Sequence, residues 1–153
     1  LGRRSGTENV AGIAGFGAAA AAALEELNQG AWSHVEKLRN ILEKTLATEA
    51  KETIFVGKDL ERLPNTSCFV SPGWKGETQV MQMDLAGFAV SSGSACSSGK
   101  VKVPRVLRAM GLSDEQAECA LRVSLGVETT EEDVLRFCEA WLKQERKTRD
   151  RAA

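Results

Sequence analysis

The chain has 153 residues, about the size of one ordinary domain and long enough for a real hydrophobic core. Its composition, 42% hydrophobic and 27% charged, argues against global disorder. Twenty basic against 21 acidic side chains give a net charge of −1, so no bulk field favours binding to nucleic acid or an anionic membrane.

The first third of the chain predicts helical structure. Ser5 with Glu8 reads as a capping box, and six alanines follow at 18–23. No apolar run approaches the ~20 residues of a membrane span, and no secretory signal is recognisable. Apolar residues then recur at steps of three and four as far as Leu46. Gly30 interrupts this stripe at a cost of roughly 1 kcal/mol, which predicts either one kinked helix or two helices.

Short strands and helices alternate in the remainder. Alternating or β-branched runs bounded by turn residues predict four strands, at 53–56, 66–70, 88–90 and 121–125. Capping and stop signals predict four helices, at 77–86, at 104–111, after Ser113 and after Thr130. Charged residues from Lys143 onward predict a frayed end.

This order of elements predicts an α+β fold, with helices on one face of a short, mainly antiparallel sheet. The composition changes at Gly30, from small residues to charged ones, so a domain junction is expected there. We expect residues 1–29 to be a connecting helix at the edge of a larger domain, 30–146 a small domain, and 147–153 a charged tail. The chain opens with Leu1 rather than Met, so we expect a fragment of a longer protein.

The four cysteines include no CxxC pair, which argues against structural zinc. Two disulfides are conceivable, but a chain of this size without a secretion signal favours reduced thiols and a cytoplasmic location. Cys68, Cys119 and Cys138 fall within predicted elements and are expected to be structural.

Cys96 lies instead within nine consecutive Ser, Gly, Ala or Cys residues, 91–99. Such a loop lacks an apolar anchor and suits a thiol that must move, although a plain connector has the same composition. Lys100, Lys102 and Arg105 follow closely, and positive charge favours the nucleophilic thiolate.

Arg122 is a second unusual residue. In the alternating strand 121–125 it falls on the face opposite Leu121, Val123 and Leu125. There the planar guanidinium of Arg122 could bind a carboxylate through two hydrogen bonds, or Arg122 could be an ordinary surface arginine. His34, the single histidine, has no partner in sequence and is expected at the surface.

Four segments together resemble one family. They are Arg4–Val10, Ala89–Gly99, Val106–Leu112 and Leu121–Gly126, which occur in this order in NifS/IscS-type cysteine desulfurases. These are pyridoxal-phosphate enzymes of the class V aminotransferase group, with an α/β fold of type I. The resemblance covers nearly the whole chain and places it at the C-terminal part of such an enzyme.

The resemblance implies a role for three residues. Cys96 would attack the sulfur of L-cysteine and become a persulfide, with L-alanine released, and Arg122 would hold the substrate carboxylate. Thr7 would bind the phosphate of pyridoxal 5′-phosphate, across a homodimer. The long cysteine loop is similar to that of the group supplying iron–sulfur assembly, so a scaffold or other sulfur-acceptor protein is the implied partner. There Cys96 would contact an iron–sulfur cluster transiently.

The chain also departs from the family. The lysine that anchors the cofactor, in a Ser-x-His-Lys context, does not occur here, because His34 is followed by Val35. The chain alone is therefore expected to be inactive. Two other functions stay open from the residues: a cofactor-free thiol carrier or redox sensor using Cys96, and a structural domain in which the loop is a linker.

Overall fold

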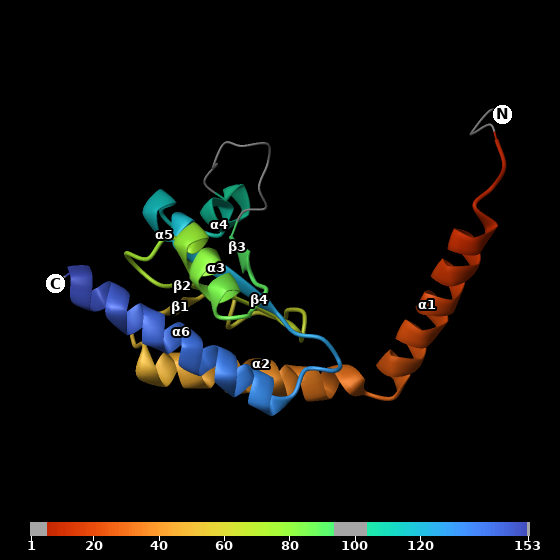
Figure 1. Ribbon diagram of the computed structural model, residues 1–153, viewed down its shortest axis with the longest axis horizontal. Coiled ribbons are helices and arrows are strands. Elements are labelled where there is room, and N and C mark those ends of the chain that lie inside the picture. Colours follow the sequence, from red (N-terminus) through yellow and green to blue (C-terminus); the bar gives the residue numbers. More distant parts are fainter. Residues whose placement is uncertain (1–5, 94–103, 153) are drawn as a thin grey trace.

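A computed structural model describes residues 6–93 and 104–152 of the chain, and these form an α+β domain with one projecting helix (Figure 1). In chain order the elements are α1 (Val10–Asn28), α2 (Ala31–Glu49), β1 (Ile54–Phe55), β2 (Thr66–Val70), α3 (Gly76–Leu85), β3 (Ser91–Ser92), α4 (Arg105–Ala109), α5 (Asp114–Glu118), β4 (Ala120–Ser124) and α6 (Glu131–Ala152). This confirms the predicted fold class.

The four strands form one antiparallel sheet in the order β1-β2-β4-β3. β2 and β4 are its central strands, and their five residue pairs run from Thr66 opposite Ser124 to Val70 opposite Ala120. β3 is an edge strand, and among the described residues it pairs with β4 alone. The last strand in sequence is therefore inserted between two earlier ones.

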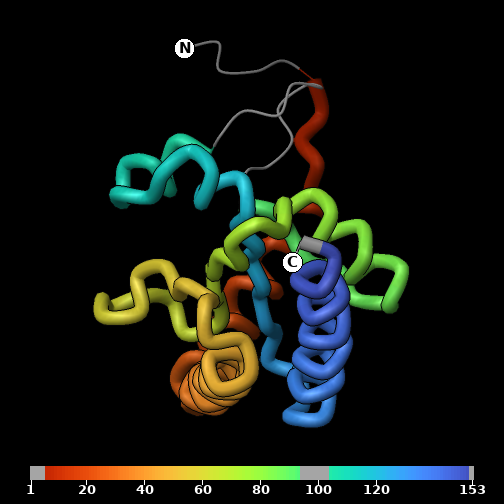
Figure 2. The backbone as a smooth tube through the Cα atoms, turned by 90° about the vertical axis from the view of Figure 1, so that its left-hand side faces the viewer, coloured from red at the N-terminus to blue at the C-terminus, as the bar shows by residue number. Residues whose placement is uncertain are grey.

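The main hydrophobic core lies between the sheet and helices α2 and α6, which lie side by side and run in the same direction (Figures 1 and 2). It is built from the apolar stripe of each helix and from the inward residues of the strands, with Trp141 fully buried at its centre. Phe69 meets Trp141 edge to face at 5.4 Å, and Trp74 lies 5.3 Å from the same ring. Such aromatic pairs add to the stabilisation from burial.

A buried amide links three parts of this core. The Gln79 side chain, fully buried on α3, donates to the carbonyl oxygens of Trp74 (2.8 Å) and Cys119 (2.9 Å). Its Oε1 accepts a hydrogen bond from the Trp141 indole at 3.0 Å. Burying a polar group without partners is costly, so this network fixes α3 relative to α6 and to the chain before β4.

The chain breaks into two helices at Gly30, one of the two predicted alternatives. α1 ends at Asn28 and α2 starts at Ala31, and Gly30 between them has φ 76°. A left-handed φ carries no steric cost for glycine, which explains why the direction changes here. α1 projects from the sheet domain, and none of its residues is buried (Figure 1).

α1 corrects the expectation that no apolar stretch reaches the length of a membrane span. By length and composition alone it could cross a membrane, with a mean hydropathy of 1.4 over its most apolar window. One such helix is weak support for a membrane location, because helices of other kinds pass the same test.

Three local expectations were wrong. The cap of α1 is Asn9, whose Oδ1 accepts from the Gly12 amide at 3.1 Å, and the expected cap Ser5 lies outside the described residues. The third strand lies at Ser91–Ser92 rather than at 88–90, because the Phe88 amide still bonds the Met83 carbonyl at the end of α3.

The third correction concerns the C-terminal end, which does not fray within the described residues. α6 continues to Ala152, and its last turns carry contacts that the charge pattern alone did not predict. Arg149 donates to Glu145 one turn earlier, and Arg146 pairs with Glu49 of α2 at 2.9 Å. Of these two pairs, that of Arg146 with Glu49 joins α6 to another helix, and it contributes little because both partners are exposed.

Candidate functional site

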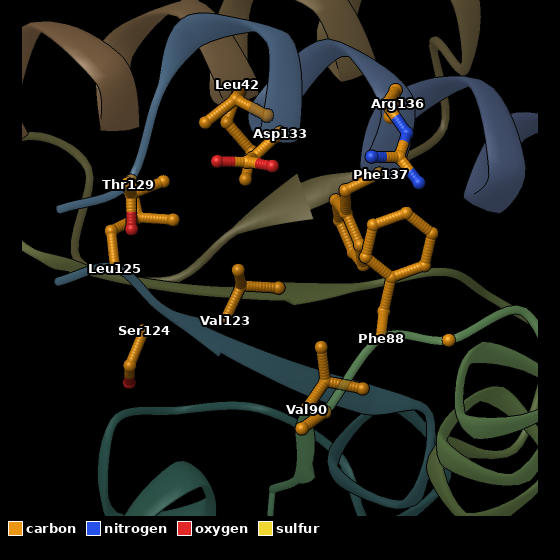
Figure 3. Close-up of a pocket in the computed structure, with 13 residues that line it drawn as sticks. Leu42, Phe88, Val90, Val123, Ser124, Leu125, Thr129, Asp133, Arg136 and Phe137 are labelled. Carbon is orange, nitrogen blue, oxygen red and sulfur yellow. The ribbon is translucent and has the colours of Figure 1, made fainter.

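Arg122 is at the middle of β4, on the sheet face opposite the main core. The alternation predicted from sequence is confirmed: Leu121 and Val123 are buried, whereas Arg122 and Ser124 are exposed. Figure 3 shows Val123 and Ser124 pointing to opposite sides of the strand. The guanidinium of Arg122 therefore faces away from α2 and α6.

Two small polar residues flank Arg122 on the same face. Cys68 of β2 is its partner on one side, and Ser91 of β3 is its partner on the other. Side chains directly opposite in antiparallel strands share a face and come into contact range. Burial raises the pKa of the half-buried Cys68 thiol above its ordinary value, and the positive charge of Arg122 partly offsets this rise.

The Arg122 guanidinium has no hydrogen bond or ion pair with any residue in the described part of the chain. Arg62 and Arg149, by contrast, each bind a carboxylate of this chain. A guanidinium presents several fixed donors that match a carboxylate. None of the described residues thus occupies the Arg122 guanidinium.

Part of this face is covered by two short helices. The next pair on this face consists of Val70 in β2 and Ala120 in β4. Both residues are fully buried, in a cluster with Leu107 of α4 and Ala117 of α5. This cover ends before Arg122, which is exposed. Arg122 therefore lies next to a buried apolar cluster on this face of the sheet.

The strand next to Arg122 leads directly into the cysteine loop. Gly93 follows β3, and its amide donates to the Ala120 carbonyl at 3.0 Å. Residues 94–103, including Cys96, lie outside the described residues. Pro104, where the description resumes, caps α4 on the same side of the sheet.

Thr7 is not brought near Arg122 within this chain. It is exposed and lies just before α1, at the end of that helix farthest from the sheet (Figure 1). The described residues thus do not bring Thr7 and Arg122 together in one site.

The two buried cysteines and the histidine lie away from Arg122, in positions that suit a structural role. Cys138 is buried against Leu42 and Trp141 in the core, and its burial raises the pKa of its thiol to about 12. Cys119 is also buried, and burial raises the pKa of its thiol. His34 is exposed on α2, as expected.

A pocket of about 260 Å³ lies between β4, residues 87–90 and the start of α6 (Figure 3). Its lining includes the apolar residues Phe88, Val90 and Phe137 as well as polar residues such as Asp133. Asp133, at its rim, accepts hydrogen bonds from the amide (3.0 Å) and hydroxyl (2.7 Å) of Thr130 and so caps α6. Arg122 does not line this pocket, so we place the candidate site on the other sheet face.

A family model described as aminotransferase class-V matches residues 1–137. The chain belongs to this family. α1 falls within the matched region, so it is part of the class-V architecture. The match confirms the resemblance noted from the cysteine loop and the other three segments.

Several curated class-V relatives are cysteine desulfurases. The protein from Cereibacter sphaeroides is 41% identical over 138 residues, which cover 90% of this chain and 35% of the relative. That from Sinorhizobium fredii is 39% identical over 150 residues, covering 96% and 38%. A desulfurase named IscS from Clostridium botulinum is 39% identical over 138 residues, covering 87% and 34%. The chain spans just over a third of the length of these relatives.

Solved structures agree with the fold. A NifS-like protein from Rickettsia africae matches with a TM-score of 0.80 and 33% identity, covering 94% of this chain and 36% of that one. A second NifS-like protein matches with a TM-score of 0.79 and 34% identity. The chain therefore has the fold of part of a NifS-like, fold type I enzyme.

Sequence reasoning found Arg122 but not its neighbours. Period-two alternation assigns a residue to a face of its own strand, whereas the neighbours across the sheet depend on strand order. Cys68 and Ser91 are 54 and 31 positions away in sequence. The insertion of β4 between β2 and β3 brings them together.

Proposed function

We propose that this chain is the part of a cysteine desulfurase that carries the sulfur-accepting thiol, Cys96, and the arginine that binds the substrate carboxylate, Arg122. The observation that carries the proposal is the Arg122 guanidinium, which has no partner among residues 6–93 and 104–152 and lies beside the strand that precedes the Cys96 segment. Similarity to cysteine desulfurases over about nine-tenths of the chain supports the same reading.

Cys96 acts as a nucleophile in this proposal. Its thiolate attacks the sulfur of L-cysteine, and a new S–S bond forms as the substrate carbon–sulfur bond breaks. The electron pair of the broken bond stays on the substrate carbon, which takes up a proton and leaves as L-alanine. Cys96 retains the extra sulfur as a persulfide. Lys100, Lys102 and Arg105 near it in sequence favour the thiolate.

Arg122 orients the substrate by binding its carboxylate through two parallel hydrogen bonds. Pyridoxal phosphate, when bound, supplies the electron sink that the broken bond requires. Its lysine anchor would come from the two thirds of the relatives' length that this chain does not match. We call this chain together with that part the assembled enzyme, whether the two belong to one polypeptide or are two separate chains.

The domain assignment is also a proposal. α1 exposes Val10, Ile13, Phe16, Leu24 and Leu27, each more than half accessible. An apolar stripe of this length is normally covered. We assign residues 1–29 to the edge of the large domain, 30–146 to the small domain, and 147–153 to the charged end.

Thr7, at the far end of α1, is assigned to the cofactor phosphate in the partner subunit of a homodimer. The proposed acceptor of the sulfur is an iron–sulfur scaffold or another acceptor protein, with transient contact between Cys96 and the cluster. Three free cysteines, Cys68, Cys119 and Cys138, favour a reducing, cytoplasmic location.

The test is alanine formation from L-cysteine by the assembled enzyme. We expect activity that requires pyridoxal phosphate and is lost in Cys96→Ser, with Cys68→Ser as the matched control that retains it. Normal alanine release by Cys96→Ser would refute the role of Cys96. Sulfur uptake onto Cys96 without cofactor or alanine would instead identify a thiol carrier.

A further inference from the structure

A second cavity, of about 180 Å³, lies between the turn after β2, the turn after α2 and the C-terminal half of α6. Its lining includes Glu52, Ser71, Trp74, Glu145 and Arg149. The last two residues lie beyond position 137, where the match to the class-V family model ends. The family assignment therefore does not by itself imply this cavity.

The indole of Trp74 carries a hydrogen-bond donor that no residue in the described part of the chain accepts. Trp74 is 2% exposed, and its Nε1 atom is buried without a partner among these residues. The buried indole of Trp141, by contrast, donates to Gln79 at 3.0 Å. Buried donors in native proteins are nearly always paired with protein, water or a ligand. A group bound in the cavity that Trp74 lines would supply the acceptor.

The wall that carries Trp74 is a rigid turn. Residues 71–74 read Ser-Pro-Gly-Trp, the Trp74 amide donates to the Ser71 carbonyl at 3.1 Å, and Gly73 has φ 79°. These are the features of a type II turn, in which proline fixes the second position and glycine adopts a positive φ at the third. Ser71 is buried, and its hydroxyl has no partner among the described residues. The turn thus places two unpaired donors in the lining.

Charged groups form another part of the lining. Arg149 donates from Nε and Nη2 to Glu145 Oε1, and its Nη1 has no partner in the described part of the chain. Glu52 lies close enough to raise the pKa of Arg149 further, in addition to the larger effect of Glu145. Two carboxylates against one guanidinium give these groups a net negative charge, so they do not favour a simple anion.

We propose that this cavity binds a small α-amino acid. The carboxylate of the ligand accepts hydrogen bonds from the Trp74 indole and the Ser71 hydroxyl, and its ammonium pairs with Glu52. A zwitterion matches a lining with both unpaired donors and an excess carboxylate, whereas a singly charged ligand satisfies only one of these. The volume holds about six water-sized groups of ~30 Å³, which is about the size of alanine. The inference does not rest on the proposed function, because Arg122 does not line this cavity.

The test is a titration of the assembled enzyme with L-alanine, followed through the isotopically labelled indole N–H signals of this chain. Trp74→Phe identifies the Trp74 signal. We expect that signal to shift with a dissociation constant on the order of 1 mM, while the signal of Trp141, which is already bonded to Gln79, stays in place. Acetate and ethylammonium, which each carry one of the two charges, should bind at least about tenfold more weakly.

A matched pair of variants tests the recognition of the ammonium group. Glu52→Gln removes the carboxylate assigned to it and should weaken L-alanine binding at least about tenfold. Glu49→Gln removes a carboxylate that pairs with Arg146 and does not line the cavity, so it should leave the affinity unchanged. If Trp74→Phe does not fold, calorimetric titration in an Arg122→Ala background, in which the proposed substrate site is weakened, makes the same comparison.

Three results would overturn the proposal. A Trp74 signal that stays in place at about 100 times the expected dissociation constant would mean that the cavity holds ordered water only. Acetate binding as tightly as L-alanine would identify a simple anion site. Equal affinities for Glu52→Gln and Glu49→Gln would remove Glu52 from the site. None of these results bears on alanine release through Cys96, and a failure of that proposed role would leave this site unaffected.

Discussion

Arg122 of β4 lies directly opposite Cys68 of β2 on the exposed face of the sheet. A thiol whose pKa is raised by burial stays uncharged near neutral pH, so it does not neutralise the guanidinium beside it. Among the described residues no carboxylate occupies Arg122, so its charge is available to a carboxylate from outside that part of the chain.

Arg122→Ala should weaken L-cysteine binding by the assembled enzyme by about 2–4 kcal/mol, because the substrate carboxylate loses its charged partner. Arg122→Lys should recover part of this loss, since an ammonium supplies charge without the planar fork. Binding is measured by titration with L-cysteine. The control is Arg136→Ala, an exposed arginine on α6. Equal affinity for Arg122→Ala and Arg136→Ala would contradict the assignment.

A negative charge placed beside Arg122 provides a complementary test. In Cys68→Asp the carboxylate would pair with Arg122 and compete with the substrate, so the KM for L-cysteine should rise about tenfold or more. Cys68→Ser preserves the size and neutrality of the side chain and should leave the KM close to its original value. Identical KM values for the two variants would show that position 68 does not affect Arg122.

Two glutamines on α3 should respond oppositely to the same substitution. Gln79→Met leaves the Trp141 indole and two carbonyl groups without their present partner, so it should lower the free energy of unfolding by about 2–4 kcal/mol. In Gln82 the buried Oε1 has no partner within the described residues, so Gln82→Met should be neutral or stabilising. Urea unfolding measures both, and a larger loss for Gln82→Met would contradict the network.

Glu43 is expected to make stability depend on pH. Burial by itself would raise the pKa of this carboxyl, but hydrogen bonds from Arg62 and Ser67, both 2.7 Å long, and the charge of Arg62 outweigh it. The pKa in the folded chain is thus lower than the ordinary value of 4.5. The resulting stability is complete above that value and is lost as the pH falls through the lowered pKa.

Glu43→Gln should therefore cost about 2–4 kcal/mol at pH 7 and flatten the loss of stability below pH ~5. Glu36→Gln is the control, because the Glu36 carboxylate is half exposed in its contact with Arg39 and should contribute less than about 1 kcal/mol. Unfolding curves from pH 7 to pH 3 provide the comparison. Parallel pH dependence in the unmodified chain and Glu43→Gln would disprove the assignment.

Local signals in the sequence predicted most elements well. β2 has the predicted bounds, and the reciprocal caps of Ser113 with Gln116 and of Thr130 with Asp133 form as expected. These features depend on residues within four positions of one another. Short-range chemistry is sufficient to specify them.

Features that depend on distant contacts could not be predicted in this way. The pairing of Arg62 with Glu43 and that of Trp141 with Gln79 join segments 19 and 62 residues apart. The run 88–90 has a strand-like composition, yet pairing begins only at Ser91 because β4 supplies its partner there. The lack of room for a side chain at Gly93 likewise depends on Ala120, Leu107 and Pro104, which no local pattern reveals.

The central claim is that sulfur from L-cysteine is transferred to Cys96 while the substrate is held by Arg122. Mass spectrometry of the assembled enzyme after a single turnover with sulfur-labelled L-cysteine tests it most directly. We predict one labelled sulfur atom on the peptide containing Cys96, much less in Arg122→Ala at low substrate, and none on the peptides containing Cys68, Cys119 or Cys138. Label on one of those cysteines, or alanine release with no label on Cys96, would contradict the account.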